Sequence, residues 1–395
     1  MKTQNYTQGS KKNPNFVAPT NRPITMSTAL YPLVPPFVAV VILIARLLID
    51  FGYKFGLVDQ PNSRSSHVGA VPRVGGISIF IPYILLGLGL YFANFDFVVN
   101  NAPYWIGLSA IVVLGTIDDR LNLSSKFKFS IQFAVATYYV LSSGNYVDNM
   151  YGLFGIGVLP SWLGITLSII TVVYLINAVN LIDGVDGLAA GTSMLSLYLL
   201  STLMGGGEFF FSFAFLGLGL FVFMGFNFSS NKKIFLGDAG SLGLGFVLAT
   251  MAMEFLHSGN GHFEHMNLSP IVAAVLILGY PIADTLRVFM IRIATGSSPF
   301  VADRRHMHHV LLDKGFTHFG TTTFIMACVG TIVLMNKTLA PLLNSHLMIV
   351  LNIGAILLIH MFVRHRSVQL RIFWRSFSRA IFNPVKKVWS RYVTN

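Results

Sequence analysis

Short polar segments between long apolar runs carry the acidic residues that could do chemistry in this chain. In the segment LINAVNLIDGVDGLAAG, Asp183 and Asp186 stand three positions apart, and each is followed by glycine. Asp118 and Asp119 end an earlier apolar run, and Asp238 stands where a later one begins. Ionisable residues at membrane depth are costly and usually functional. Two unit charges about 4 Å apart repel by roughly 4 kcal/mol at an effective dielectric of 20, so we expect several protonated acids or a bound cation.

These acids indicate a site for a hard cation and phosphate. Mg²⁺ binds through one or two carboxylates together with substrate phosphates, and Mn²⁺ is the alternative ion. Gly184 and Gly237 let the backbone approach a ligand closely, and helix N-termini suit phosphate. The basic side chains that could contact phosphate oxygens are Lys126, Arg304, Arg305, His306, His308 and His309. The set predicts magnesium-assisted phosphoryl transfer.

Simpler roles compete at several of these positions. The first acidic pair could be a solvated loop start, and the later acids could cap helices, because Asp is a good N-cap residue. The histidines with Asp303 could bind zinc or form a plain basic loop. Gly75 and Gly76 could be a simple turn. Asp284 and Arg287, at i and i+3, are predicted to form a structural ion pair.

The composition favours lipid as the solvent for much of the chain. Of 395 residues, 54% are hydrophobic and 11% charged, and the mean hydropathy is +0.66. Soluble domains carry about a quarter charged residues, so we predict one integral membrane domain. The single cysteine, Cys328, excludes an internal disulfide framework. The net charge of +12 lies in short loops and the tails, and no RNA motif or zinc-finger spacing supports a nucleic-acid partner.

The apolar runs predict an all-α polytopic membrane protein with about eleven transmembrane helices. The expected spans lie near 30–51, 75–93, 104–117, 127–142, 160–179, 188–205, 209–228, 239–256, 269–291, 320–336 and 346–363. We place the N-terminus outside and the C-terminus in the cytoplasm, because the outside loops after the first span then contain only Lys337. The basic N-terminal tail breaks this rule. All the polar motifs then fall on the cytoplasmic side.

Three regions follow from this arrangement. Residues 1–27 are predicted to be a disordered polar tail, and residues 28–363 to be the transmembrane domain. Residues 364–395 are predicted to be a basic cytoplasmic tail with interleaved aromatic residues. A helix in that tail would lie along an anionic leaflet.

Five ordered motifs between Leu57 and Gly315 resemble those of the polyprenyl-phosphate N-acetylhexosamine-1-phosphate transferases. They read GLVDQPNSRSSHVGAVPRVGGIS, IDDRLNLSSK, NAVNLIDGVDGLAAG, FLGDAGS and SSPFVADRRHMHH. The likeness is to the branch that makes undecaprenyl-diphosphate N-acetylglucosamine. It implies that N-acetylglucosamine 1-phosphate passes from UDP-N-acetylglucosamine to undecaprenyl phosphate, with release of UMP and with Mg²⁺. The expected place is the cytoplasmic side of the bacterial inner membrane, at the first lipid-linked step of a cell-surface polysaccharide such as O-antigen or enterobacterial common antigen.

The same resemblance implies roles for the acidic residues. Asp118 and Asp119 match the family's paired aspartates near the lipid phosphate and the metal. Asp238 matches a metal-binding aspartate, so Asp118 and Asp238 are the expected metal ligands. Lys126 matches the lysine that follows the pair. Either acid of the pair would orient or deprotonate the lipid phosphate for direct attack on the β-phosphorus; a two-step route through an aspartyl-phosphate stays open.

The remaining matches concern the nucleotide sugar. Asn180, Asp183 and Asp186 match the nucleotide-side motif, and Phe235 matches the aromatic residue that stacks on uracil. The resemblance implies that the histidines handle the diphosphate or the sugar. The further substrate contacts that we expect are Asn227, Arg304, Arg305, Gly75 and Gly76.

Alternatives remain for the donor sugar and for the class of function. The donor could be another UDP-N-acetylhexosamine or a muramyl-pentapeptide nucleotide. The segment DRRHMHH, with Met307 in place of the usual isoleucine, lacks the three consecutive histidines of the muramyl-pentapeptide relatives and speaks against that donor. Two other classes are an ion-coupled transporter, which the position of the acids at helix ends disfavours, and a passive scaffold, which would tolerate Asp119→Asn without loss of function. A homodimer stays open.

Overall fold

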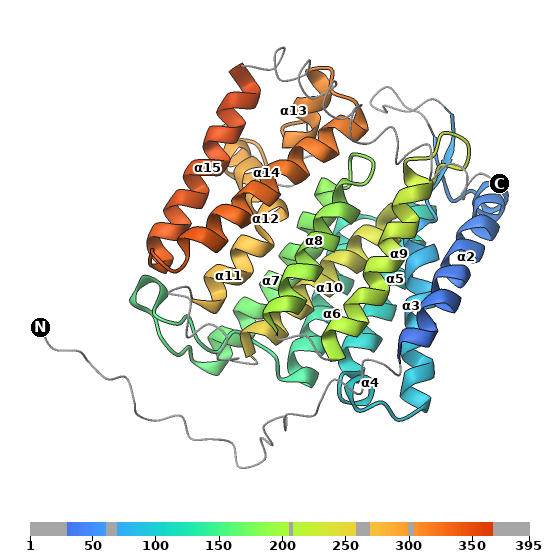
Figure 1. Ribbon diagram of the computed structural model, residues 1–395, viewed down its shortest axis with the longest axis horizontal. Helices are drawn as coiled ribbons and strands as arrows, with labels where there is room; N and C mark the ends of the chain where they lie inside the picture. The colour runs from blue at the N-terminus through green and yellow to red at the C-terminus, as the bar shows by residue number, and fades with distance from the viewer. Residues whose placement is uncertain (1–29, 61–68, 205–207, 258–268, 299–303, 366–395) are drawn as a thin grey trace, which may run out of the picture.

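The computed structural model describes residues 30–60, 69–204, 208–257, 269–298 and 304–365. Helices make up most of this part of the chain (Figure 1). The helices are α2 (Val34–Phe55), α3 (Gly75–Phe92), α4 (Asp96–Asn100), α5 (Ala102–Leu121), α6 (Ser125–Ser143), α7 (Ser161–Ile182), α8 (Leu188–Leu203), α9 (Glu208–Asn227), α10 (Gly237–His257), α11 (Pro270–Ile277), α12 (Gly279–Ala294), α13 (Met307–Asp313), α14 (His318–Leu339) and α15 (Ser345–His365), with short 3₁₀ turns at η1 (Tyr31–Leu33) and η2 (Leu153–Gly155).

The expected spans coincide with helices in the described part of the chain. Each of the apolar runs falls on a helix or, for 269–291, on the pair α11–α12, which bends by 80°. Among the described residues, six helices are long and apolar enough to cross a membrane, or up to seven if the bent pair is one span. The all-α membrane class is therefore confirmed. The count of eleven and the orientation of both termini stay predictions, and residues 1–27 and most of 364–395 lie outside the described residues.

Local sequence explains where several helices begin. The side chains of Ser124, Ser269 and Thr317 accept hydrogen bonds from backbone N–H groups three residues later, at the starts of α6, α11 and α14. Such N-caps satisfy N–H groups that have no partner within the helix. At the start of α10, two backbone N–H groups donate instead to a side chain of α5.

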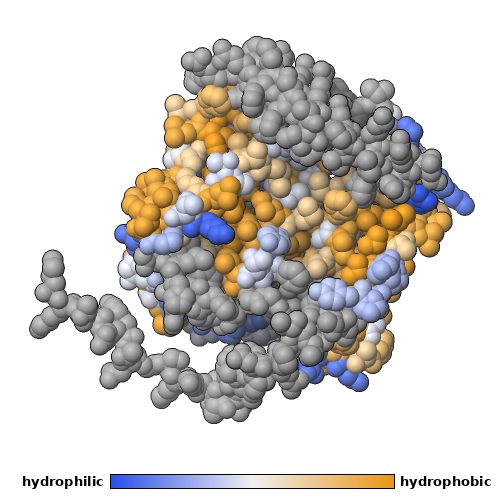
Figure 2. All heavy atoms as spheres, viewed as in Figure 1, coloured by the Kyte–Doolittle hydropathy of each residue, from blue (hydrophilic) through white to orange (hydrophobic). Residues whose placement is uncertain are grey.

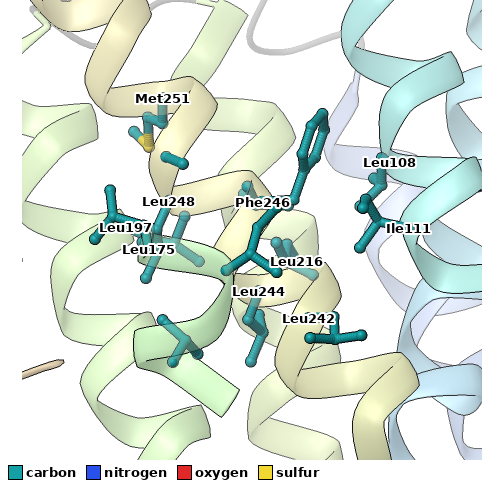
Figure 3. Packing of buried hydrophobic residues seen from close by; sticks show 14 of the residues in the cluster. Leu108, Ile111, Leu175, Leu197, Leu216, Leu242, Leu244, Phe246, Leu248 and Met251 are labelled. Atoms are coloured by element: carbon teal, nitrogen blue, oxygen red, sulfur yellow. The ribbon is translucent and has the colours of Figure 1, made fainter. Parts of the chain in front are cut away.

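The core of the protein is centred on α10. In its most apolar window, 94% of the residues are buried, and it packs against α3, α5, α7 and α8. Figure 3 shows side chains of α10, among them Phe246, with Leu175 of α7, Leu197 of α8 and Leu216 of α9 near them. Lipid tails are as apolar as leucine, so close packing rather than water exclusion favours such contacts between membrane helices.

The outer helices differ from α10 in their exposure. α2 and α15 bury only 17% of their most apolar windows, and large side chains such as Leu47 and Leu358 are exposed. Hydrophobic residues make up much of the coloured surface in Figure 2. This surface suits contact with lipid rather than water.

A small antiparallel sheet lies at the end of the bundle where α10 begins. It pairs β1 (Val58–Asp59) with β2 (Val71–Pro72). The backbone then continues beside residues 235–236: Gly75 N–H donates to the Phe235 carbonyl at 2.8 Å, and Gly76 N–H to the Leu236 carbonyl at 2.7 Å. These bonds fix the start of α3 against the start of α10.

Candidate active site

A cavity of about 310 Å³ opens at this end of the bundle. Its walls come from β1, the segment after β2, the ends of α5, α7 and α9, the start of α10, and α13 and α14. The predicted site residues that line it are Asp119, Asn180, Asp183, Asp186, Asn227, Phe235, Asp238, Arg304 and His309. Segments that are far apart in the sequence therefore meet at one end of the bundle, as the motifs predict.

Asp119 holds the start of the central helix. Its Oδ1 accepts a hydrogen bond from Asp238 N–H at 2.9 Å, and its Oδ2 accepts one from Ala239 N–H at 3.0 Å. Asp119 is 5% exposed. Gly237 has a φ of 71°, and a Cβ there would lie 2.6 Å from Asp119 Oδ2, so glycine is required at this position. Asp119 is thus an N-cap supplied by α5 to α10.

Asp118 belongs to an ion-pair network behind the cavity wall. It is buried and does not line the cavity; its Oδ1 accepts from Leu123 N–H at 2.7 Å, and its Oδ2 pairs with Lys128 Nζ at 2.6 Å. Lys128 Nζ also lies 3.4 Å from Asp238 Oδ2. Lys126, the lysine named from the sequence, is exposed and does not line the cavity. Lys128 does not line the cavity either, but it is the lysine of α6 that contacts Asp118 and Asp238.

Asp238 and Asn180 connect α10 to the end of α7. Asn180 Nδ2 donates to Asp238 Oδ1 at 3.0 Å and to Ser241 Oγ at 2.8 Å. Asp238 lies in the first turn of α10, where the partial positive charge of the helix N-terminus favours a carboxylate. Its side chain remains 30% exposed, so it can still meet a ligand in the cavity.

Asp183 and Asp186 lie on the turn between α7 and α8. Among the described residues, no hydrogen bond or ion pair reaches the Asp183 carboxyl group. Burial raises its pKa well above the usual value, and the nearby carboxylates of Asp238, Asp119 and Asp186 raise it further. Neither acid caps α8, whose N-cap is Gly187. The capping alternative is therefore wrong for this pair.

Asp186 has basic partners. Its Oδ2 pairs with Lys233 Nζ at 2.6 Å and lies 3.5 Å from His318 Nδ1. Lys233 Nζ also lies 5.3 Å from the centre of the Phe235 ring. Phe235 and Asp186 line one corner of the cavity, with Lys233 beside both, and a planar base could stack and donate hydrogen bonds there.

The histidine segment meets the cavity through one of its three members. His309 lines the cavity, whereas His308 is 0% exposed and lies beside Gly184, where a Cβ would be 2.5 Å from its Nε2. Burial lowers the pKa of His308 to about 3, so its imidazole is neutral at pH 7. His306 Nδ1 lies 2.8 Å from Asp284 Oδ2, away from the cavity. The zinc alternative has no support among the described residues, and Asp303 lies outside them.

Three further predicted contacts lie elsewhere. Arg305 does not line the cavity, and its guanidinium donates to Thr295 Oγ1 at 3.1 Å. Gly75 and Gly76 do not line it either, since they let α3 approach α10: a Cβ on Gly76 would lie 2.0 Å from Gly240 N. The absence of a side chain at these two glycines allows α3 to pack closely against α10. Arg304 does line the cavity, and it also pairs with exposed Asp313 at 2.6 Å.

The cavity also contains residues that the sequence does not predict as site residues. Arg73 lines the cavity next to its ion-pair partner Asp59, and His318 lines it from α14. Arg73 stands in the motif GAVPRVGG, so a charged residue inside a glycine-rich loop was the available signal. His318 follows the last motif and gave no such signal.

The described residues contain no group of three His, Cys, Asp or Glu side chains arranged to hold a metal ion. Mg²⁺ needs fewer protein ligands when a diphosphate supplies the rest. Asp183 and Asp238 fit that requirement, because both line the cavity and Asp183 lacks a described partner. Asp118, expected as a ligand, does not line the cavity and already bonds Lys128 and Leu123.

The fold and the site define a helical membrane protein with a cavity of mixed acids and bases at one end of the bundle. Residues 102–256 match the family model of glycosyl transferase family 4. The chain is 32% identical over 287 residues to the "Probable undecaprenyl-phosphate N-acetylglucosaminyl 1-phosphate transferase" of Bacillus subtilis, covering 70% of this chain and 76% of that protein. The chain belongs to glycosyl transferase family 4.

Two enterobacterial relatives are similar to this chain to nearly the same degree. The "Undecaprenyl-phosphate alpha-N-acetylglucosaminyl 1-phosphate transferase" of Escherichia coli K12 is 31% identical over 278 residues, or 67% of this chain and 71% of the relative. The protein of that name from Yersinia pestis is 30% identical over 283 residues, covering 67% of this chain and 72% of the relative. The family expected from the motifs is confirmed.

Proposed function

We propose that this protein transfers N-acetylglucosamine 1-phosphate from UDP-N-acetylglucosamine to undecaprenyl phosphate, giving undecaprenyl-diphosphate N-acetylglucosamine and UMP. The names of the relatives support this reaction. The observation that carries it is the meeting of acids and bases from distant segments at one cavity, which suits a diphosphate substrate. We place the reaction at the cytoplasmic face of a bacterial inner membrane, as the first lipid-linked step of a surface polysaccharide.

In the proposed reaction, an oxygen of the lipid phosphate attacks the β-phosphorus of the nucleotide sugar. A new P–O bond forms, the bond from the β-phosphorus to the bridging oxygen breaks, and UMP leaves with the electron pair. Asp183 and Asp238 would hold Mg²⁺, or Mn²⁺ in its place, which supplies charge neutralisation at the diphosphate when bound. Arg73 and Arg304 supply hydrogen bonds to phosphate oxygens.

Other residues would bind and orient the substrate. Phe235 presents a ring on which uracil can stack, and Lys233 lies beside it. Lys128 stabilises the position of Asp238 through their ion pair. Both oxygens of Asp119 already accept backbone hydrogen bonds, and Asp118 pairs with Lys128, which favours direct attack over an aspartyl-phosphate on either residue.

The test uses purified protein in detergent with undecaprenyl phosphate and a panel of UDP-sugars that includes the N-acetylgalactosamine and muramyl-pentapeptide donors. We expect UMP release that requires both substrates and Mg²⁺, and mass spectrometry should find the lipid-diphosphate N-acetylglucosamine. Preference for another donor would replace the sugar and keep the chemistry. Full turnover in excess EDTA, or UMP release without the lipid, would overturn the proposed reaction.

A further inference from the structure

Asp284 and Arg287 form a buried cluster on α12 that does not line the cavity. They are 4% and 8% exposed, and Arg287 donates to Asp284 Oδ1 at 2.8 Å. The sequence predicts only a structural ion pair here. The structure adds that the pair bonds every residue of one short segment, 305–307.

Each of the bonds to that segment has normal geometry. His306 Nδ1 lies 2.8 Å from Asp284 Oδ2, and Met307 N–H donates to Asp284 Oδ1 at 3.1 Å. Arg287 also donates to the Arg305 carbonyl at 2.7 Å. Two side chains therefore fix three consecutive residues. We call Asp284 and Arg287 the α12 clamp.

Stability alone does not account for the burial of the α12 clamp. Burying two charges costs desolvation, and well-packed apolar residues often do as well or better, so a buried ion pair is weak evidence for a stabilising role. Such groups can instead select one geometry for a neighbouring segment. The bonds to residues 305–307 indicate which segment that is.

The clamped segment leads directly to the cavity. The ring of His308 stacks on that of His306, with centroids 5.7 Å apart and planes at 17°. The ring centroids of His308 and His309 lie 4.2 Å apart. His308 in turn lies against Gly184 of the acidic turn, and His309 lines the cavity. A shift of His306 would therefore be passed through His308 to the acidic turn and the cavity wall.

We propose that Asp284 and Arg287 are positioning residues of the transferase, which fix residues 305–307 and thereby set the place of His308 and His309 at the cavity. The proposal rests on the proposed function for its kinetic test. Displacement of a group by about 1 Å can cost roughly 10²-fold in rate. We therefore expect Asp284→Asn and Arg287→Met to lower kcat by about 10- to 100-fold. KM for both substrates should change by less than about threefold, because neither residue lines the cavity.

Matched controls remove a charge elsewhere. Asp96→Asn and Lys337→Met alter exposed residues outside the site, and both should keep the wild-type kcat. Arg287→Lys keeps the charge and loses the planar fork of donors, so its kcat should lie between those of the wild type and Arg287→Met. Hydrogen–deuterium exchange should show faster exchange of residues 305–309 in Asp284→Asn, with the protection of α10 unchanged.

A double-mutant cycle distinguishes positioning from an independent effect. If Asp284 acts through His308, then Asp284→Asn should lower kcat by less than about threefold further in a His308→Ala background. The proposal would be overturned if the fold-losses in kcat of Asp284→Asn and His308→Ala multiply in the double variant. It would also be overturned if kcat is unchanged in the single variants, or if both Asp284→Asn and Arg287→Met unfold. Absence of wild-type turnover would instead reject the proposed function, and the exchange experiment would still decide whether the clamp fixes the segment.

Discussion

The two pairs of acidic residues at this end of the bundle differ in how many of their carboxylate oxygens already have partners. At the end of α5, Asp118 and Asp119 are almost fully buried, and all four of their oxygens have partners. On the turn after α7, Asp183 has no partner among the described residues, and burial raises its pKa. The comparison separates acids that hold helices in place from an acid that is ready to meet a cation or a substrate.

The largest expected effect is on activity, at Asp183. Asp183→Asn should lower kcat by about 10²–10³-fold, because a carboxylate that meets the reacting diphosphate is removed. Its thermal unfolding temperature in detergent should equal or exceed that of the wild type. Rates of UMP release and unfolding curves check both outcomes, with Asp96→Asn as the matched control. A variant that keeps its activity but loses stability would reverse the comparison.

The opposite pattern is expected at Asp119. Asp119→Ala leaves two N–H groups at the buried start of α10 without an acceptor, which should lower the free energy of unfolding by about 2–4 kcal/mol. Asp119→Asn keeps one acceptor oxygen and should lose less. Unfolding by SDS titration in mixed micelles measures the difference. Wild-type stability in Asp119→Ala would show that another group caps α10.

A smaller effect should separate two neighbouring lysines. Lys128→Met leaves Asp118 buried without its cation and should lower kcat by about 10- to 100-fold. Lys126→Met alters an exposed side chain and should change kcat by less than about twofold. Rates of UMP release from both variants, expressed and purified in parallel, test the assignment. Equal losses in the two would contradict it.

The smallest effect is a dependence of stability on pH, measured in EDTA. The folded pKa of Asp183 is raised, so the native state binds more protons than the unfolded state between the two pKa values. Stability then rises as pH falls through that window, by at most about 1.4 kcal/mol per pH unit for one proton. Asp183→Asn should therefore be more stable than the wild type at alkaline pH, with an advantage that shrinks on acidification. A constant difference across pH would show that Asp183 does not titrate in this way.

The sequence is sufficient to predict the helices and the end of the bundle at which the acids meet. Apolar runs bounded by polar motifs are long-range signals, and they survive errors of a few residues at each boundary. The direction in which a single side chain points is harder to predict from the sequence. Residues two apart on a helix point about 200° apart, so only the packing of α6 decides that Lys128, and not Lys126, reaches the acids.

The same limit explains the other differences at the site. Asp118 and Asp119 are adjacent in the sequence, yet one bonds α6 and the other caps α10. That cap depends on a helix more than a hundred residues away, which no local pattern contains. Arg73 and His318 reach the cavity for a similar reason, since the segments that carry them are placed by contacts with other parts of the chain.

The burial of α10 has a consequence for how the chain is made. α3, α5, α7 and α8 surround α10 but precede it in the sequence, so they leave the ribosome before the helix that fills the space between them. Until α10 has been synthesised, the earlier helices lack the helix that they pack against, and the carboxylate of Asp119 lacks the two backbone N–H groups that donate to it. The cavity is completed later still, because Arg304, His309 and His318, which also line it, follow α10 in the sequence.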